Sequence, residues 1–338
     1  MSWTLFWAIV AGLLIAGLLY QAIGAIRDRR RFAPPGVLIS VGAHRLHYRC
    51  EGAGTPAVVL DAGIAASSLS WSRVQPAVAG FTRVCSYDRA GLAWSEYSPT
   101  ARSMPALVSE LRSLLQHVGV SPPYVLVGHS FGGMVVRAFA RAHPSEVAGL
   151  VFVDTLHPEE WCEPSSEQRH LLRGGVFLSR VGAVLARLGV VRLSLSLLSG
   201  GAPGVPRRFS HLFGSRAATL LGHMVGEVQK LPPEVLPSVQ AHWSNPRAFH
   251  GMRQHLAALP SCCADVVCGT DTFGDMPVVV LSAGKRDPRW VAAGDSLARA
   301  SSRGRHIVSP HSGHWVHLDD PDLVVHAIRE VVDLVRGG

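Results

Sequence analysis

Tyr124-Val-Leu-Val-Gly-His-Ser-Phe-Gly-Gly-Met134 is the stretch of this 338-residue chain that decides its fold class. Its apolar beginning predicts a short buried strand, and residues 134–142 predict a helix. Between them, a G-x-S-x-G pattern holds Ser130 in a tight turn, where the helix dipole favours developing negative charge. The stretch therefore predicts a nucleophile elbow with Ser130 as the nucleophile. An ordinary glycine-rich loop is the alternative if the motif stands alone.

A serine hydroxyl needs a base and an orienting acid, expected in the order Ser, Asp/Glu, His. Residues 277–282 predict another buried strand, and Asp287 ends the Gly-x-x-Asp loop after it. His314 lies in a loop between a predicted short strand and a predicted helix. We predict that Asp287 is the acid and His314 the base. Asp154, at the end of a predicted apolar strand, is the alternative acid, but the later loop fits that role better.

Other histidines near these candidates admit different interpretations. His311, His314 and His317 are evenly spaced, which would suit a metal site, but Gly313 breaks the segment and no cysteine or carboxylate cluster completes a zinc set. We therefore predict no metal and no cofactor. His129 lies inside the elbow, where its side chain should point away from Ser130, so we predict a packing role for it.

These motifs resemble the α/β-hydrolase superfamily, in its serine esterase-like branch, over residues 37–338 apart from a middle insertion. The resemblance implies an α/β fold with a mostly parallel central sheet, helices on both faces and a helical cap. It also implies an oxyanion hole formed by the backbone N–H groups of Ile64 and Phe131. Residues 87–91 match the family's Asp-Arg-x-Gly turn, which we interpret as structural.

The chain departs from the family pattern at two positions. Ala62 stands where members often have His before the oxyanion glycine, and Ala93 replaces a common Gly in the turn after Asp88. Backbone amides alone must then hold the oxyanion. Neither change affects a candidate triad residue.

The N-terminal segment, residues 1–26, predicts a transmembrane anchor. Residues 2–26 carry no charge, and about 24 helical residues span about 36 Å, enough to cross a bilayer core of about 30 Å. A cleaved signal peptide is the alternative, but no basic region precedes the apolar run. Residues 27–36 predict a basic juxtamembrane segment and linker. Its arginines favour a cytoplasmic catalytic domain and attract anionic lipids.

Composition excludes some partners. The net charge is +8, but the arginines are scattered and no nucleic-acid motif accompanies them, so we predict no nucleic-acid partner. The six cysteines are few for this length. Cys50 and Cys85 lie in strands that the family topology makes neighbours, so a contact between them is conceivable. In a cytoplasmic domain we expect all six to remain reduced.

Residues 158–258 are more than the core fold needs, so we predict a cap insertion there. Leucine and valine recur at helical spacing between Leu171 and Leu188, and a second periodic stretch runs over residues 217–228. With the anchor, this apolar content suggests a pocket for an apolar acyl or alcohol group. The same residues could instead only pack the cap onto the core.

The sequence thus predicts a membrane-anchored serine hydrolase that cleaves small-molecule carboxylic esters through an acyl-enzyme. Epoxide and haloalkane hydrolysis are disfavoured, because family members with those activities generally have Asp at the position of Ser130. Amide or peptide hydrolysis on the same triad is the alternative within the fold. A catalytically silent ligand-binding protein is the alternative of a different class. The oligomeric state is not predicted.

Overall fold

The computed structural model describes residues 2–199, 228–269 and 272–337. The chain divides into two compact units. One unit comprises Met1–Ala33 and Gly174–Arg253, and the other comprises Pro34–Arg173 and Gln254–Gly338. The second unit carries every candidate catalytic residue, and we call it the catalytic unit.

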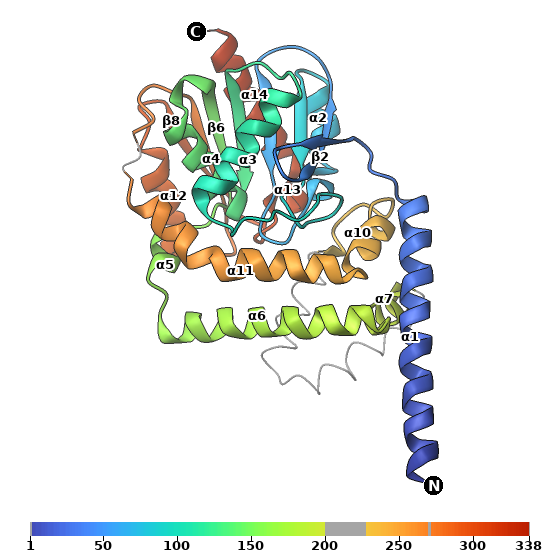
Figure 1. Cartoon of the computed structure of the whole chain (residues 1–338). Coiled ribbons are helices and arrows are strands. Elements are labelled where there is room, and N and C mark those ends of the chain that lie inside the picture. Colours follow the sequence, from blue (N-terminus) through green and yellow to red (C-terminus); the bar gives the residue numbers. More distant parts are fainter. Residues whose placement is uncertain (1, 200–227, 270–271, 338) are drawn as a thin grey trace. The chain divides into compact units, whose positions relative to one another are not determined.

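An eight-stranded sheet forms the centre of the catalytic unit, in the order β1-β2-β4-β3-β5-β6-β7-β8 (Figure 1). Strands β1 and β2 pair antiparallel, as do β2 and β4, and all the other pairs are parallel. The predicted mostly parallel sheet is therefore confirmed. The strands are β1 (Val37–Ser40), β2 (Arg45–Glu51), β3 (Ala57–Asp61), β4 (Val84–Tyr87), β5 (Tyr124–His129), β6 (Val147–Val153), β7 (Val278–Ala283) and β8 (Gly304–Ser309).

Helices cover both faces of this sheet, which explains why the central strands are apolar on both sides. Successive residues of β3 enter different cores: Val59 packs in the core that includes α3 and α4, whereas Val58 and Leu60 pack in the core that includes α2 and α14. The helices of this unit are α2 (Gln75–Ala79), α3 (Met104–His117), α4 (Phe131–Ala142), α5 (Glu159–Cys162), α12 (Pro288–Ala298), α13 (Val316–Asp319) and α14 (Pro321–Arg336), with short 3-10 turns at Ser68–Trp71 and Pro144–Glu146.

The register of the parallel strands determines what meets at the end of the sheet. In the β5–β6 pair, His129 lies opposite Val153. The next residues are Ser130 and Asp154, so these two side chains leave neighbouring strands at the same edge. In open α/β sheets, ligand sites form at the carboxyl ends of the strands.

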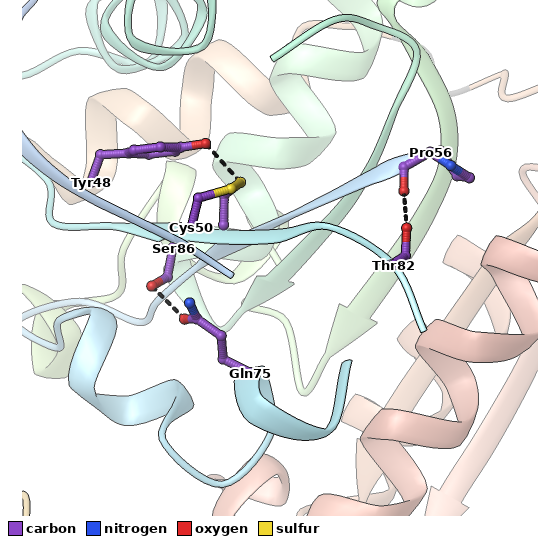
Figure 2. Close-up of a disulfide and its surroundings, with 7 residues drawn as sticks. Tyr48, Cys50, Pro56, Gln75, Thr82 and Ser86 are labelled. Atoms are coloured by element: carbon purple, nitrogen blue, oxygen red, sulfur yellow. Dashed lines mark hydrogen bonds between the residues drawn. A yellow bond between two sulfur atoms is a disulfide. The ribbon is translucent and has the colours of Figure 1, made fainter. Parts of the chain in front are cut away.

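A disulfide joins β2 to β4 through Cys50 and Cys85, which lie directly opposite each other (Figure 2). The Tyr48 hydroxyl donates a hydrogen bond of 2.7 Å to Cys85 Sγ. The expected contact between these cysteines is present, but the expectation that all six stay reduced is not met. The other described cysteines, Cys162, Cys262, Cys263 and Cys268, are free.

The other unit is helical in its described part. It contains α1 (Trp3–Arg31), α7 (Val190–Ser199) and α10 (Leu236–Trp243), whereas α6 (Ser166–Arg187) and α11 (Pro246–Val267) belong to both units. Helix α1 continues through Arg31, so the basic juxtamembrane residues are helical. The Gly174–Arg253 part falls within the predicted insertion, whose bounds remain a prediction. Most of the periodic stretch 217–228 lies outside the described residues.

Candidate active site

Ser130 occupies a strained backbone position between β5 and α4. Its φ of 53° and ψ of −119° are unusual for a residue with a side chain, and such conformations cost about 1–3 kcal/mol. Backbone hydrogen bonds hold it there: the Ser130 N–H donates to the Val153 carbonyl (3.1 Å), and the Ser130 carbonyl accepts from the amides of Gly133 (3.0 Å) and Leu156 (3.1 Å). Neighbouring strands thus fix the turn.

Glycines on both sides of Ser130 allow the chain to pass this closely. A Cβ added to Gly128 would lie 2.5 Å from the backbone of Gly132 and Gly133, and one added to Gly132 would lie 2.4 Å from the Asp61 carbonyl oxygen at the end of β3. Substitution at either position must therefore shift backbone. The G-x-S-x-G pattern is a steric requirement of this turn.

Ser130, His314 and Asp154 form one continuous hydrogen-bonded chain. His314 Nε2 lies 3.0 Å from Ser130 Oγ, and His314 Nδ1 lies 2.6 Å from Asp154 Oδ2. An ionised carboxylate only accepts hydrogen bonds, so Nδ1 carries the proton and Nε2 presents its lone pair to the hydroxyl. The arrangement can remove a proton from Ser130.

Asp154 is held firmly at the end of β6. Its φ is 41°, and its backbone N–H donates to the Leu281 carbonyl at 2.7 Å. The Ala283 amide donates to Asp154 Oδ1 at 3.0 Å. Arg286 Nε lies 3.4 Å from Asp154 Oδ2, the same oxygen that faces His314.

The structure corrects the predicted position of the acid, because it does not bring Asp287 to His314. Asp287 caps the N-terminus of α12: its carboxylate accepts from the Arg289 amide at 2.9 Å and pairs with the Arg289 guanidinium at 2.9 Å. The Arg289 side chain and amide lower the pKa of Asp287. The following Pro288 is a signal for this role, since Asp before a first-turn proline is typical of a helix cap.

The predicted oxyanion loop lies against the nucleophile. A Cβ on Gly63, the residue before Ile64, would lie 3.4 Å from Ser130 Cβ. Phe131 is the first residue of α4, so its amide has no acceptor within the helix. Both amides therefore belong to segments beside Ser130, and their role in binding an oxyanion remains a prediction.

Arg89, interpreted from sequence only as part of a structural turn, fastens this loop. Its guanidinium is buried, pairs with Asp61 and donates to the carbonyls of Ala62 and Gly63. Tyr87 donates to the other oxygen of Asp61 at 2.7 Å. The Asp-Arg-x-Gly turn thus fixes the backbone just before Ile64.

His129, for which the sequence predicted a packing role, contacts the candidate base. Its Nε2 lies 3.0 Å from the backbone carbonyl oxygen of His314. That oxygen only accepts, so Nε2 carries the proton. Burial, followed by the charges of His317 and His314, lowers the pKa of His129 well below its ordinary value. A neutral His129 therefore supports the loop that carries His314.

The described residues include no group of three His, Cys, Asp or Glu side chains that could hold a metal ion. His317 is buried, with its ring 4.7 Å from that of Trp71. That no cofactor is required remains a prediction.

An 18-residue window of α1 has a mean hydropathy of 2.1. By length and composition this helix could cross a membrane or serve as a signal sequence. The predicted anchor is therefore supported only to that extent, and its orientation is not determined.

Comparison with known proteins agrees with this geometry. The sequence profile of the α/β hydrolase fold matches residues 56–180. An uncharacterised protein of Schizosaccharomyces pombe is 27% identical over 268 residues, covering 77% of this chain and 43% of that protein. A soluble epoxide hydrolase of Corynebacterium is 32% identical over 116 residues, covering 34% of this chain and 40% of that protein. The chain spans less than half the length of the curated relatives it matches first.

Among solved structures, a thermophilic esterase from Thermogutta terrifontis aligns with a TM-score of 0.61 and 22% identity, covering 88% of this chain and 98% of that one. This likeness concerns the fold, whereas the family profile and the curated relatives concern the sequence. Together with the sheet order and the elbow, they show that the chain has the fold of the α/β-hydrolase superfamily.

Proposed function

We propose that the protein is a serine hydrolase that cleaves carboxylic esters through an acyl-enzyme. The observation that carries this proposal is the unbroken chain from Ser130 Oγ through His314 to the Asp154 carboxylate. The serine at the elbow also supports this reaction, because an acyl-enzyme can form on a hydroxyl that an adjacent base activates.

In the proposed reaction, Ser130 Oγ attacks the ester carbonyl while His314 Nε2 takes its proton. The amides of Ile64 and Phe131 bind the oxyanion, and losing one such donor typically costs about 3–4 kcal/mol. His314 then protonates the departing alcohol. Water, deprotonated by the same imidazole, releases the acid. Asp154 holds the imidazole in the required tautomer and stabilises its charged form.

The test is hydrolysis of p-nitrophenyl esters of increasing acyl length by the full chain in detergent. Ser130→Ala should abolish turnover, and Ser261→Ala, an exposed serine on α11, should leave it unchanged. A stoichiometric fluorophosphonate adduct on Ser130 gives an independent readout. Adduct formation without ester turnover would direct the search to amides. If the wild-type protein gives no adduct and no turnover, the result would favour a ligand-binding protein.

The same series tests the proposed apolar substrate group. The apolar residues of α6 and α7 and the N-terminal helix motivate a preference for longer acyl or alcohol chains. A rise of kcat/KM with acyl length supports an extended apolar pocket. Equal rates from acetyl onward would contradict it.

We further propose that α1 attaches the protein to a membrane. The arginines at the end of α1 favour a cytoplasmic catalytic unit, whereas the Cys50–Cys85 disulfide favours an oxidising compartment. Resistance of the full chain to alkaline extraction tests attachment, and protease protection in spheroplasts and inverted vesicles tests the side. Quantitative release by alkali would refute the anchor.

A further inference from the structure

Helix α1 is bound by polar contacts within its own unit. Gln21 is buried, and its Nε2 donates to the Ser244 carbonyl, after α10, at 2.9 Å. Arg192 of α7 donates from Nε to Gln21 Oε1 at 2.9 Å and pairs through Nη1 with Asp28 at 2.7 Å. These contacts join α1 to two segments far from it in sequence.

Small residues bring α1 and the start of α7 together. A Cβ on Gly17 would lie 2.4 Å from the Leu188 carbonyl oxygen, and one on Gly24 would lie 2.4 Å from Arg192 Nε. Gly189, with φ of 74°, approaches the Gly17 carbonyl in the same way. With Gln21 and Asp28, these α1 positions follow helical spacing along one face, which we call the docked face.

The length of α1 means that it can cross a bilayer only if part of the docked segment also enters the bilayer. The docked segment, residues 17–28, is about 16 Å long, and residues 3–16 are about 20 Å long. A bilayer core is about 30 Å thick, so residues 3–16 alone are too short to cross it. Membrane insertion of α1 therefore brings part of its docked face, and α7 with it, to the lipid.

Exposed apolar residues lie on both helices of this pair. On the docked segment, Leu19, Ile23 and Ile26 are exposed. On α7, the exposed residues Val190, Leu193 and Leu197 recur at i, i+3 and i+7, and so share one face. At about 100° per residue, the centre of this face lies about 130° around α7 from Arg192, so it is on the side of α7 away from the contact with α1.

We infer that the membrane-binding element is α1 together with α7, with Val190, Leu193 and Leu197 entering the acyl-chain region beside α1. This inference rests on the proposed membrane attachment, which it extends from an N-terminal tether to an embedded part of the insertion. Arg192 enters the membrane boundary already paired with Asp28 and Gln21, which reduces the cost of burying its charge. In this arrangement the lipid bilayer covers the apolar face of α7.

The test uses the full chain in phosphatidylcholine vesicles, with a protease site inserted in the linker at residues 33–36. Cleavage after reconstitution separates α1 from the rest of the chain. If α1 is only a tether, the remainder leaves the vesicles. If α7 is embedded and docked on α1, the remainder stays bound through a wash in about 1 M KCl, where the Debye length is about 3 Å.

Two sets of substitutions assign the retention to these contacts. Arg192→Ala should release the cleaved remainder by undocking α7, and joint Val190→Ser, Leu193→Ser and Leu197→Ser should release it by removing the apolar face. Val308→Ser with Leu334→Ser, exposed apolar positions of the catalytic unit, is the control and should be retained. Thermal melting shows that each variant is folded.

Release of the cleaved wild-type remainder overturns the inference. So does a detergent-stable dimer that the triple serine variant abolishes while vesicle retention persists, because a second copy would then cover this face. Vesicle retention is measured without any catalytic assay. The result can therefore be interpreted even if the protein proves not to be an esterase. Failure of the membrane proposal is seen earlier, as uncleaved full chain that does not float with the vesicles.

Discussion

Arg286 lies beside the acid of the proposed triad and should limit how readily the base accepts the Ser130 proton during catalysis. Its Nε is 3.4 Å from Asp154 Oδ2, and the same oxygen is 2.6 Å from His314 Nδ1. Its guanidinium stacks on the Trp290 ring, 3.6 Å from the centroid. A fixed positive charge here opposes the imidazolium that forms in the transition state, so Arg286→Gln should raise kcat/KM.

The distances set the size of the effect. The two contacts to Oδ2 limit the separation of Arg286 Nε and His314 Nδ1 to about 6 Å. At that distance two unit charges repel by about 0.7 kcal/mol at a dielectric constant of about 80, and by about 2.8 kcal/mol at about 20. These energies correspond to rate changes of about 3-fold and about 100-fold. Asp154 favours the charged imidazole in both proteins, His129 faces the His314 ring, and His317 faces the ring of His129.

The assay is kcat/KM for a neutral p-nitrophenyl ester, measured for all proteins in the same buffer. Arg286→Gln should raise kcat/KM by about 3- to 100-fold. Arg289→Gln is the matched control: it removes an arginine that pairs with Asp287 at the surface. An unchanged kcat/KM for Arg286→Gln, or an equal rise for Arg289→Gln, would refute this reasoning.

Three further predictions follow from the same contacts. Asp154→Asn should lower kcat on the order of 10⁴-fold, whereas the kcat of Asp287→Asn should remain close to that of the wild type. A larger loss of ester hydrolysis in Asp287→Asn than in Asp154→Asn would restore Asp287 as the acid. Burial lowers the pKa of His129 below about 6.5, so the unfolded state binds more protons there and stability should fall as pH drops below that value. His129→Phe should weaken this dependence in urea titrations at about pH 5 and about pH 7.5, and an unchanged slope would contradict it. Gly132→Val would press on the Asp61 carbonyl and should cost about 1–3 kcal/mol or more in the free energy of unfolding; a neutral result would show that the turn can relax.

Local sequence was enough to select Ser130 and His314, which the structure brings within 3.0 Å of each other. Ser130 follows a buried strand and begins a helix, with glycines where the turn admits no Cβ. His314 follows the last predicted strand in the order that the nucleophile requires. The mostly parallel sheet was predictable for the same reason, since strands buried on both faces are apolar throughout.

The acid and its surroundings were decided by contacts between distant segments. Both Asp154 and Asp287 follow buried strands, and sequence spacing favoured the later one. In the structure β6 is the direct neighbour of β5. Asp154, which has a positive φ, places its carboxylate against His314. Asp287 instead caps the N-terminus of α12. Arg89 pairs with Asp61 across the ends of β4 and β3, and Arg286 pairs with Asp154 across the ends of β7 and β6.

The sequence by itself therefore determined the elbow, the candidate base and the apolar character of α1, because each depends on neighbouring residues or on composition. Tertiary structure alone decided which carboxylate reaches His314 and that α1 packs against α7 and α10. Strand order and register depend on packing between residues far apart in the chain, which local patterns do not encode. The same holds for the close approach of helices at Gly17 and Gly24.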